Sequence, residues 1–353
     1  MRASIERVTG GAGDDAALAR AASLIRRGEL VAFPTETVYG LGANALDESA
    51  VEKIFAAKGR PFADPLIVHL ASADDVASVT ASIPPGCREL MRAFWPGPLT
   101  LIMPRGAAVP RRVTAGRDTV AVRVPAHPVA QALLARAGVP IAAPSANRFS
   151  RPSPTTAAHV ADDLGEALDL ILDGGPTRHG VESTVLDLTS DPPVVLRPGA
   201  VTLEALREFV PGVAVTAEFE TTRPYAAEKS PGTSMKHYSP NAEVRLWTGE
   251  AGEARAAMRH DAGQAIAAGR RVGALIVDED APAFDGLDVT LWRLGSERAL
   301  DVVAARLYDG LRALDRARVD VILARDPGRT GLALTIRDRL FRAAEGRVLD
   351  SRR

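Results

Sequence analysis

Threonine, serine, lysine and arginine side chains recur in short segments punctuated by Gly and Pro, and these types can orient a polar substrate and neutralise phosphate. Residues 34–42 read PTETVYGLG, whose hydroxyls could hold a small molecule or could simply cap a turn. Residues 58–61 read KGRP, in which Lys58 is a mobile point charge and Arg60 a planar fork. Both cations could face one polyphosphate. Cations also favour helix C-termini, so a purely structural role stays open.

Further polar clusters lie within strands or at their predicted ends. They contain Asp64 and His69 in 64–69, Thr119 and Arg123 in 119–125, Ser145 and Asn147 in 143–147, Ser183 in 180–184, and Arg197 in 196–199. A histidine at a strand end is commonly structural, and an arginine within a strand can form a sheet-edge ion pair. Ligands of open α/β sheets nevertheless gather at the carboxyl ends of strands. We therefore expect the clusters to meet in one positively charged cleft.

Several common signatures are missing. The chain has no GxxxxGK[ST], GxSxG or HExxH motif. Residues 40–45, GLGANA, match the dinucleotide fingerprint GxGxxA, but six residues separate them from the preceding predicted strand, where a tight strand-to-helix turn is required. The single Cys87 excludes a disulfide framework and a multi-cysteine metal site. We expect no organic cofactor and no protein-bound metal.

Length and composition bound the class of protein. At 353 residues two domains are expected, with one large domain as the alternative. Apolar residues make up 46% and charged residues 25%, which is typical of a folded globular chain. The formal charge of −1 gives no global attraction to nucleic acid or anionic membranes. Without a signal-like or membrane-spanning apolar run, a cytoplasmic protein is expected.

The polar clusters need an α/β framework to position them. Short β-branched runs alternate with segments of helical period. The predicted strands of the first part are 30–33, 66–70, 99–103, 119–124, 141–143, 170–172, 184–188 and 194–196, with helices at 14–27, 48–57, 129–136, 155–164 and 203–209. Residues 211–240 predict a linker, and 241–353 a smaller Rossmann-like α/β domain.

The motifs PTETVYGLG, KGRPFADPLIVH, TVAVRVP, APSAN, ESTV and LRPG, in that order, resemble the YrdC-like superfamily of threonylcarbamoyl-AMP synthases. The resemblance covers about residues 14–200, and SPGTSMKHYSP and 300–344 resemble the linker and extra domain of its long form. It implies a catalytic domain at 1–210 with a twisted mixed sheet, helices and a concave cleft. It also implies a linker at 211–240 that closes over the nucleotide as a lid.

This resemblance implies that L-threonine, bicarbonate and ATP react to threonylcarbamoyl-adenylate and pyrophosphate, the first step toward threonylcarbamoyladenosine in tRNA. The residues implied for L-threonine are Thr35, Thr37, Tyr39, His69, Arg123, Ser145 and Ser183. Those implied for ATP are Lys58, Arg60, Asp64, Thr119, Asn147, Thr155, Arg197 and Tyr238. Among them, Lys58, Arg60, Ser145 and Asn147 are expected to be catalytic. Mg²⁺ is expected with ATP, together with a downstream threonylcarbamoyl-transfer machinery.

Two features depart from the family pattern, and two other functions stay open. The linker reads SPGTSMKHYSP, where the family more often has a basic residue between the Lys and the His. Asp64 stands where many members carry Asn, and an acid there must orient another group to be compatible with phosphate. The chain could instead be a non-catalytic RNA-binding module with a weak tRNA contact, although its neutral charge argues against this. It could also transfer carbamoyl groups from another activated carbamate, although it lacks segments resembling an acylphosphatase or a zinc finger.

Overall fold

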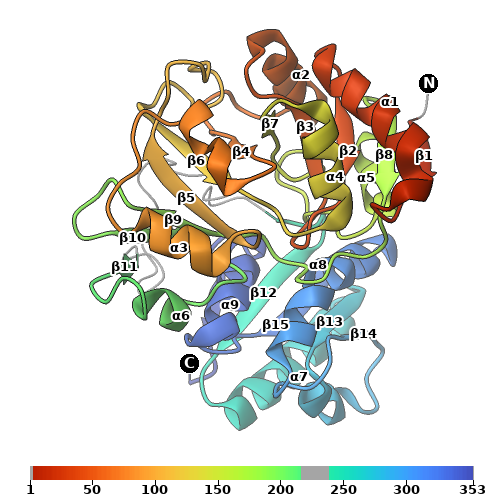
Figure 1. The fold of residues 1–353 in the computed structure, drawn as a ribbon. Coiled ribbons are helices and arrows are strands. Elements are labelled where there is room, and N and C mark those ends of the chain that lie inside the picture. The colour runs from red at the N-terminus through yellow and green to blue at the C-terminus, as the bar shows by residue number, and fades with distance from the viewer. Residues whose placement is uncertain (1–2, 216–237, 353) are drawn as a thin grey trace.

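Two β-sheets organise the chain, each in its own α/β domain (Figure 1). The structure is a computed structural model that describes residues 3–215 and 238–352. In spatial order, the strands of the first sheet are β1 (Ser4–Arg7), β8 (Leu170–Asp173), β2 (Val31–Phe33), β3 (Gly40–Asn44), β7 (Ile141–Ala142), β4 (Ile67–His69), β6 (Thr119–Arg123), β5 (Leu99–Pro104), β9 (Thr184–Asp187), β10 (Val194–Arg197) and β11 (Ala214–Val215). Parallel and antiparallel pairs alternate irregularly across it, so the predicted mixed sheet is confirmed.

Helices cover both faces of this sheet, because successive side chains of its strands point to opposite sides. Val31 and Phe33 of β2 pack in one apolar cluster with α1 (Asp15–Arg26) and α4 (Pro128–Ala137). Ala32, between them, packs on the other face with α2 (Glu48–Lys58) and α5 (Ala157–Leu164). The shorter helices are α3 (Cys87–Phe94) and α6 (Leu203–Arg207).

The second sheet is parallel throughout its described strands. Its order is β14 (Val289–Arg293), β13 (Val272–Ile276), β15 (Val321–Arg325), β12 (Glu243–Thr248) and β16 (Val348–Asp350). One face packs on α7 (Ala251–Ala267), the other on α8 (Leu300–Arg316) and α9 (Gly331–Ala343). The apolar cluster around α8 and α9 also takes in Val38 and Val181 of the first domain, so the two domains share buried surface.

Residues 40–45, which match the dinucleotide fingerprint, do not form a turn before a helix. Their first five residues form β3, which pairs antiparallel with β2 and β7. Gly42 is needed there for packing: a Cβ at this position would lie 2.8 Å from Phe33 and 2.9 Å from Ile141. The two glycines therefore serve the sheet and not a pyrophosphate. The strands β1, β3, β11 and β16 and the helix α3 were absent from the sequence prediction.

The ends of α2 set the position of Lys58. Asp47 caps its N-terminus, as its carboxylate accepts hydrogen bonds from the backbone N–H groups of Ser49 and Ala50. Gly59 ends it in the left-handed conformation, with φ of 62°, which favours glycine. Most of the predicted linker lies outside the described residues, and its role as a lid stays a prediction. None of the helices within 3–215 and 238–352 combines the length and the apolar character needed to cross a bilayer.

Candidate active site

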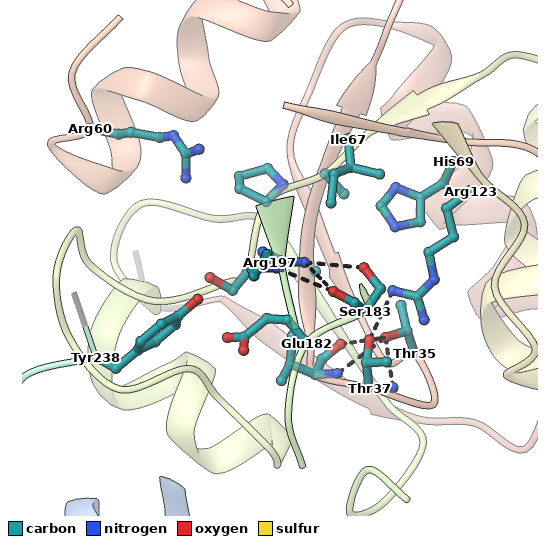
Figure 2. Close-up of a pocket in the computed structure, with 15 residues that line it drawn as sticks. Thr35, Thr37, Arg60, Ile67, His69, Arg123, Glu182, Ser183, Arg197 and Tyr238 are labelled. Atoms are coloured by element: carbon teal, nitrogen blue, oxygen red, sulfur yellow. Dashed lines mark hydrogen bonds between the residues drawn. The ribbon is translucent and has the colours of Figure 1, made fainter. Parts of the chain in front are cut away.

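One pocket gathers residues from each of the six motif segments (Figure 2). Its walls are Thr35, Thr37, Val38, Gly40, Arg60, Ile67, His69, Arg123, Ala143, Pro144, Ser145, Glu182, Ser183, Arg197 and Tyr238. Six of the seven residues predicted for L-threonine are among them, but only three of the eight predicted for ATP. The hollow has a volume of about 40 Å³, room for a few water-sized groups. A nucleotide would therefore have to extend beyond it.

Arg123, the last residue of β6, is a buried cation of the pocket wall. Its Nε donates to the Gly97 carbonyl at 3.1 Å, Nη1 to Thr37 Oγ1 at 2.9 Å and Nη2 to Glu36 Oε1 at 2.6 Å. A guanidinium has five N–H groups, so two remain after these contacts within the described chain. The planar group is thus held in place with donors left for an incoming carboxylate.

Glu36 was missed by the sequence prediction, although it lies within the PTETV motif. Its second oxygen accepts from the backbone N–H of Ala126 at 3.0 Å. Burial alone would raise the pKa of Glu36, but the charge of Arg123 holds that pKa below its ordinary value. The only sequence signal for its role was an acidic residue between two threonines of that motif.

His69 presents a neutral imidazole to the pocket. Burial, and then the charge of Arg123, lowers the pKa of His69 from 6.5 to about 3. Its Nδ1 is buried and has no hydrogen-bond partner among the described residues. The ring packs edge-on against Phe33, with the ring centroids 6.2 Å apart. The neutral ring therefore lines the cavity, and its buried Nδ1 is left without a partner among the described residues.

Ser183 and Arg197 form a second polar wall. Arg197 Nη2 donates to Ser183 Oγ at 3.1 Å and to the Ser183 carbonyl at 2.9 Å. The Ser183 hydroxyl also shares a 2.8 Å hydrogen bond with Thr100 Oγ1. Burial lowers the pKa of the Arg197 guanidinium, and nearby tyrosines and Glu182 oppose that shift. The serine is consequently fixed from two sides.

Arg60 lines the pocket as an ion pair. Its Nη2 lies 2.8 Å from Asp64 Oδ2, and both side chains are buried. Nη2 also donates to the Pro65 carbonyl at 2.8 Å. The acid that departs from the family pattern thus orients Arg60. Since Arg123 is paired with Glu36 and Glu182 lies near Arg197, the pocket is not the purely positive cleft expected from the sequence.

Lys58 and Asn147 lie behind the pocket wall. Lys58 Nζ donates to the backbone carbonyls of Ser145 and Asn147, and burial followed by the charge of Arg60 lowers the pKa of Lys58 well below its usual value. Asn147 Nδ2 donates to two backbone carbonyls, and its buried Oδ1 has no partner among the described residues. In this arrangement Lys58 holds the loop that carries Ser145.

Three other predicted residues are placed outside the pocket wall. Tyr39 turns away, and its hydroxyl donates to the Gly175 carbonyl at 2.7 Å. Thr119 begins β6, about 13 Å along the strand from Arg123. Thr155 Oγ1 is 3.3 Å from His159 Nδ1. Groups of three or more His, Cys, Asp or Glu side chains able to hold a metal are not found in the described part of the chain.

Comparison with known proteins gives two family matches that together span most of the chain. A model described as "Telomere recombination" matches residues 23–199, and one described as "Threonylcarbamoyl-AMP synthase, C-terminal domain" matches residues 201–345. The threonylcarbamoyl-AMP synthase of Bacillus subtilis is 45% identical over 339 residues, 95% of each chain. The chain belongs to the threonylcarbamoyl-AMP synthase family. The resemblance inferred from the motifs is thereby confirmed.

Relatives in this family differ in length. The crystal structure of Pyrococcus abyssi Sua5 complexed with L-threonine matches with a TM-score of 0.92 and 42% identity, covering 98% of this chain and 99% of that chain. The threonylcarbamoyl-AMP synthase of Halorhodospira halophila is 40% identical over 154 residues, which are 44% of this chain and 81% of its own length. The family thus includes both a two-domain form, to which this chain corresponds, and a short form.

Proposed function

We propose that this protein makes L-threonylcarbamoyladenylate from L-threonine, bicarbonate and ATP, with release of pyrophosphate. The product would be the activated donor for threonylcarbamoyladenosine in tRNA, used by a separate transferase in the cytoplasm. Family membership supports the reaction class, and the similar Pyrococcus abyssi protein has been solved with L-threonine. The observation that carries the proposal is Arg123, a buried and oriented guanidinium with two N–H groups left after its contacts with described residues.

In this proposal the threonine carboxylate binds Arg123 as a two-pronged ion pair. Such pairs combine charge with fixed geometry, which suits recognition of a planar carboxylate. Thr35 and Thr37 share a 2.8 Å hydrogen bond beside it, and Ser145 and Ser183 supply further hydroxyls for the substrate's polar groups. Tyr39 is assigned to holding the loop through Gly175 and not to the ligand.

The amine of threonine must be neutral to attack carbon. Because the pKa of His69 is lowered to about 3, its imidazole stays neutral near pH 7 and adds no charge beside the substrate. We assign this neutral imidazole, which lines the pocket, to hydrogen bonding with the substrate's amine or hydroxyl. The amine bonds to the carbon of bicarbonate, water leaves, and an oxygen of the resulting carbamate then attacks the α-phosphorus of ATP. The bond from that phosphorus to the bridging oxygen breaks, and pyrophosphate leaves.

Positioning and charge neutralisation supply the rate in this scheme, since it uses no covalent enzyme nucleophile. Arg60 and Arg197 face the pocket and are assigned to the phosphates, while Asp64 sets the direction of Arg60. Lys58 supports the loop that carries Ser145. Asn147 is assigned to ATP, and its Oδ1 has no hydrogen-bond partner among the described residues. Thr119, Thr155 and Tyr238 remain proposals for ATP, as it would extend beyond the small hollow. Mg²⁺ arrives as part of the substrate, held by phosphate oxygens and water.

The experiment is a coupled pyrophosphate assay on the purified protein. We expect pyrophosphate from Mg·ATP only when both L-threonine and bicarbonate are present. Omitting each in turn, and replacing L-threonine by L-valine, provides the controls. Pyrophosphate release that does not depend on threonine, in protein that binds ATP, would refute the proposal.

A further inference from the structure

The second domain contributes directly to the environment of the pocket. Helices α8 and α9 pack on the two first-domain segments that hold Ser183 and Arg197. A Cβ at Gly180 would lie 2.5 Å from the backbone of Ala305 in α8, so the two domains touch backbone to backbone there. From α9, Thr335 Oγ1 donates to the Gly199 carbonyl at 2.9 Å.

Glu182, whose side chain lines the pocket, is one of the points of contact between the domains. Arg339 Nε donates to Glu182 Oε2 at 2.7 Å, and the Tyr308 hydroxyl lies 2.9 and 3.1 Å from its two oxygens. Ser153 Oγ is the first-domain donor, at 2.5 Å from Oε1. Glu182 is 5% exposed and Arg339 fully buried, so Glu182 depends on Arg339 for compensation; Arg339 has a second buried anionic partner, Asp338, to which its Nη1 donates.

The Arg339 guanidinium also reaches the segment that follows Arg197. Its Nη2 donates to the Pro198 carbonyl at 2.9 Å. Its central carbon lies 5.2 Å from the ring centroid of Tyr238, and that ring packs 5.3 Å from the ring of Tyr308. Arg339 therefore contacts both chain segments that form this part of the pocket wall, one at Glu182 and the other at Pro198, next to Arg197.

We propose that Arg339 and Tyr308 are positioning residues for substrate binding and that they act through Glu182, an inference that rests on the proposed function. While Arg339 compensates Glu182, Arg197 remains bonded to Ser183. When Arg339 is removed, the buried carboxylate turns to the next cation, Arg197, and draws it away from Ser183. The C-terminal domain is then part of the binding site in this two-domain chain.

The test compares Arg339→Met with a matched interdomain variant. Arg312 is also buried and crosses the same interface, where it donates to Asp163 Oδ2 and to the Pro152 carbonyl, and none of these three residues is among those that line the pocket. We expect Arg339→Met to raise the dissociation constant for L-threonine at least about tenfold by calorimetry, and Arg312→Met less than about twofold. Both should lower the melting temperature.

A double variant separates positioning from general loosening. Because a neutral amide does not compete for Arg197, Arg339→Met with Glu182→Gln should recover most of the threonine affinity lost in Arg339→Met. The affinity of Arg339→Met should also improve as pH falls and Glu182 takes up a proton; Asp338, the other carboxylate paired with Arg339, keeps Arg342 as a partner. If Arg339→Met does not fold, Tyr308→Phe should raise the constant about threefold.

Hydrogen exchange tests the inference without any substrate. Amides at 182–184 and 197–200 should exchange faster in Arg339→Met, while those at 151–164 should not; Arg312→Met should show the reverse. Unchanged exchange at 182–184 in folded Arg339→Met, or equal losses of threonine affinity in the Arg339 and Arg312 variants, would overturn the inference. If the wild-type protein binds no threonine, the proposed function fails and the exchange result alone decides.

Discussion

Replacing Arg123 by Lys keeps a positive charge in the pocket wall but removes the planar guanidinium. The guanidinium uses three N–H groups on Gly97, Thr37 and Glu36 and leaves two for the threonine carboxylate. A Lys ammonium has three donors in all and cannot satisfy both sets. Charge-assisted hydrogen bonds contribute about 1.5–3 kcal/mol each, and the remaining point charge offsets part of the loss. We therefore expect binding to weaken by about 2–3 kcal/mol, or about 30- to 150-fold.

Titration calorimetry with L-threonine measures this change, and circular dichroism reports whether the variant is folded. Arg105→Lys is the matched control, since the Arg105 guanidinium donates to the Gly106 and Val109 carbonyls and lies outside the pocket wall. It should leave threonine affinity within about twofold of the wild type. Folded Arg123→Lys protein with wild-type affinity would refute the role of the Arg123 guanidinium in binding the threonine carboxylate.

Further predictions concern charge, pH and packing. Arg60→Ala should weaken ATP binding by at least about 1.5 kcal/mol. Asp64→Asn should strengthen ATP binding, because Arg60 then loses the carboxylate that competes with phosphate. An unchanged ATP affinity in both variants would exclude the pair from the nucleotide site. The pKa of His69 is lowered from 6.5 to about 3, so the folded state takes up fewer protons than the unfolded state in that range. The contribution of His69 to the free energy of unfolding therefore falls as pH drops from 6.5 toward 3, by up to about 1.4 kcal/mol per pH unit. Urea unfolding of His69→Gln should show a smaller loss of unfolding free energy between pH 7 and pH 5 than wild type shows. Gly42→Ala should cost about 1–3 kcal/mol of folding free energy by overpacking against Phe33 and Ile141, and an unchanged denaturation midpoint would contradict the close packing seen there.

The order of the predicted elements followed from hydrophobic period, and most strands lie within one or two residues of their predicted bounds. The helix that begins after Asp47 was predicted from its N-cap, and the carboxylate does cap that helix. Strand β3 was missed because Gly-Leu-Gly-Ala-Asn carries little β propensity; it pairs with β2 and β7, and at Gly42 its neighbours Phe33 and Ile141 leave no room for a Cβ. Tertiary packing decided the conformation of that segment.

The pocket could be predicted at the level of which segments meet, because loops at strand ends converge in an α/β sheet. Which side chains line it could be predicted only in part: six of the seven residues expected for L-threonine do, but only three of the eight expected for ATP. Lys58 and Tyr39 belong to the motifs, yet both turn to backbone carbonyls outside the cavity. The carboxylates of Glu36 and Glu182 were missed because their partners, Arg123 and Arg339, lie far away in the sequence, and residue types alone do not pair them.

A crystal structure of the protein soaked with L-threonine tests the central claim most directly. We expect the threonine carboxylate on the two remaining N–H groups of Arg123, with Ser183 and His69 beside the amine and hydroxyl. Threonine bound elsewhere, with the guanidinium still contacting only Gly97, Thr37 and Glu36, would contradict the account.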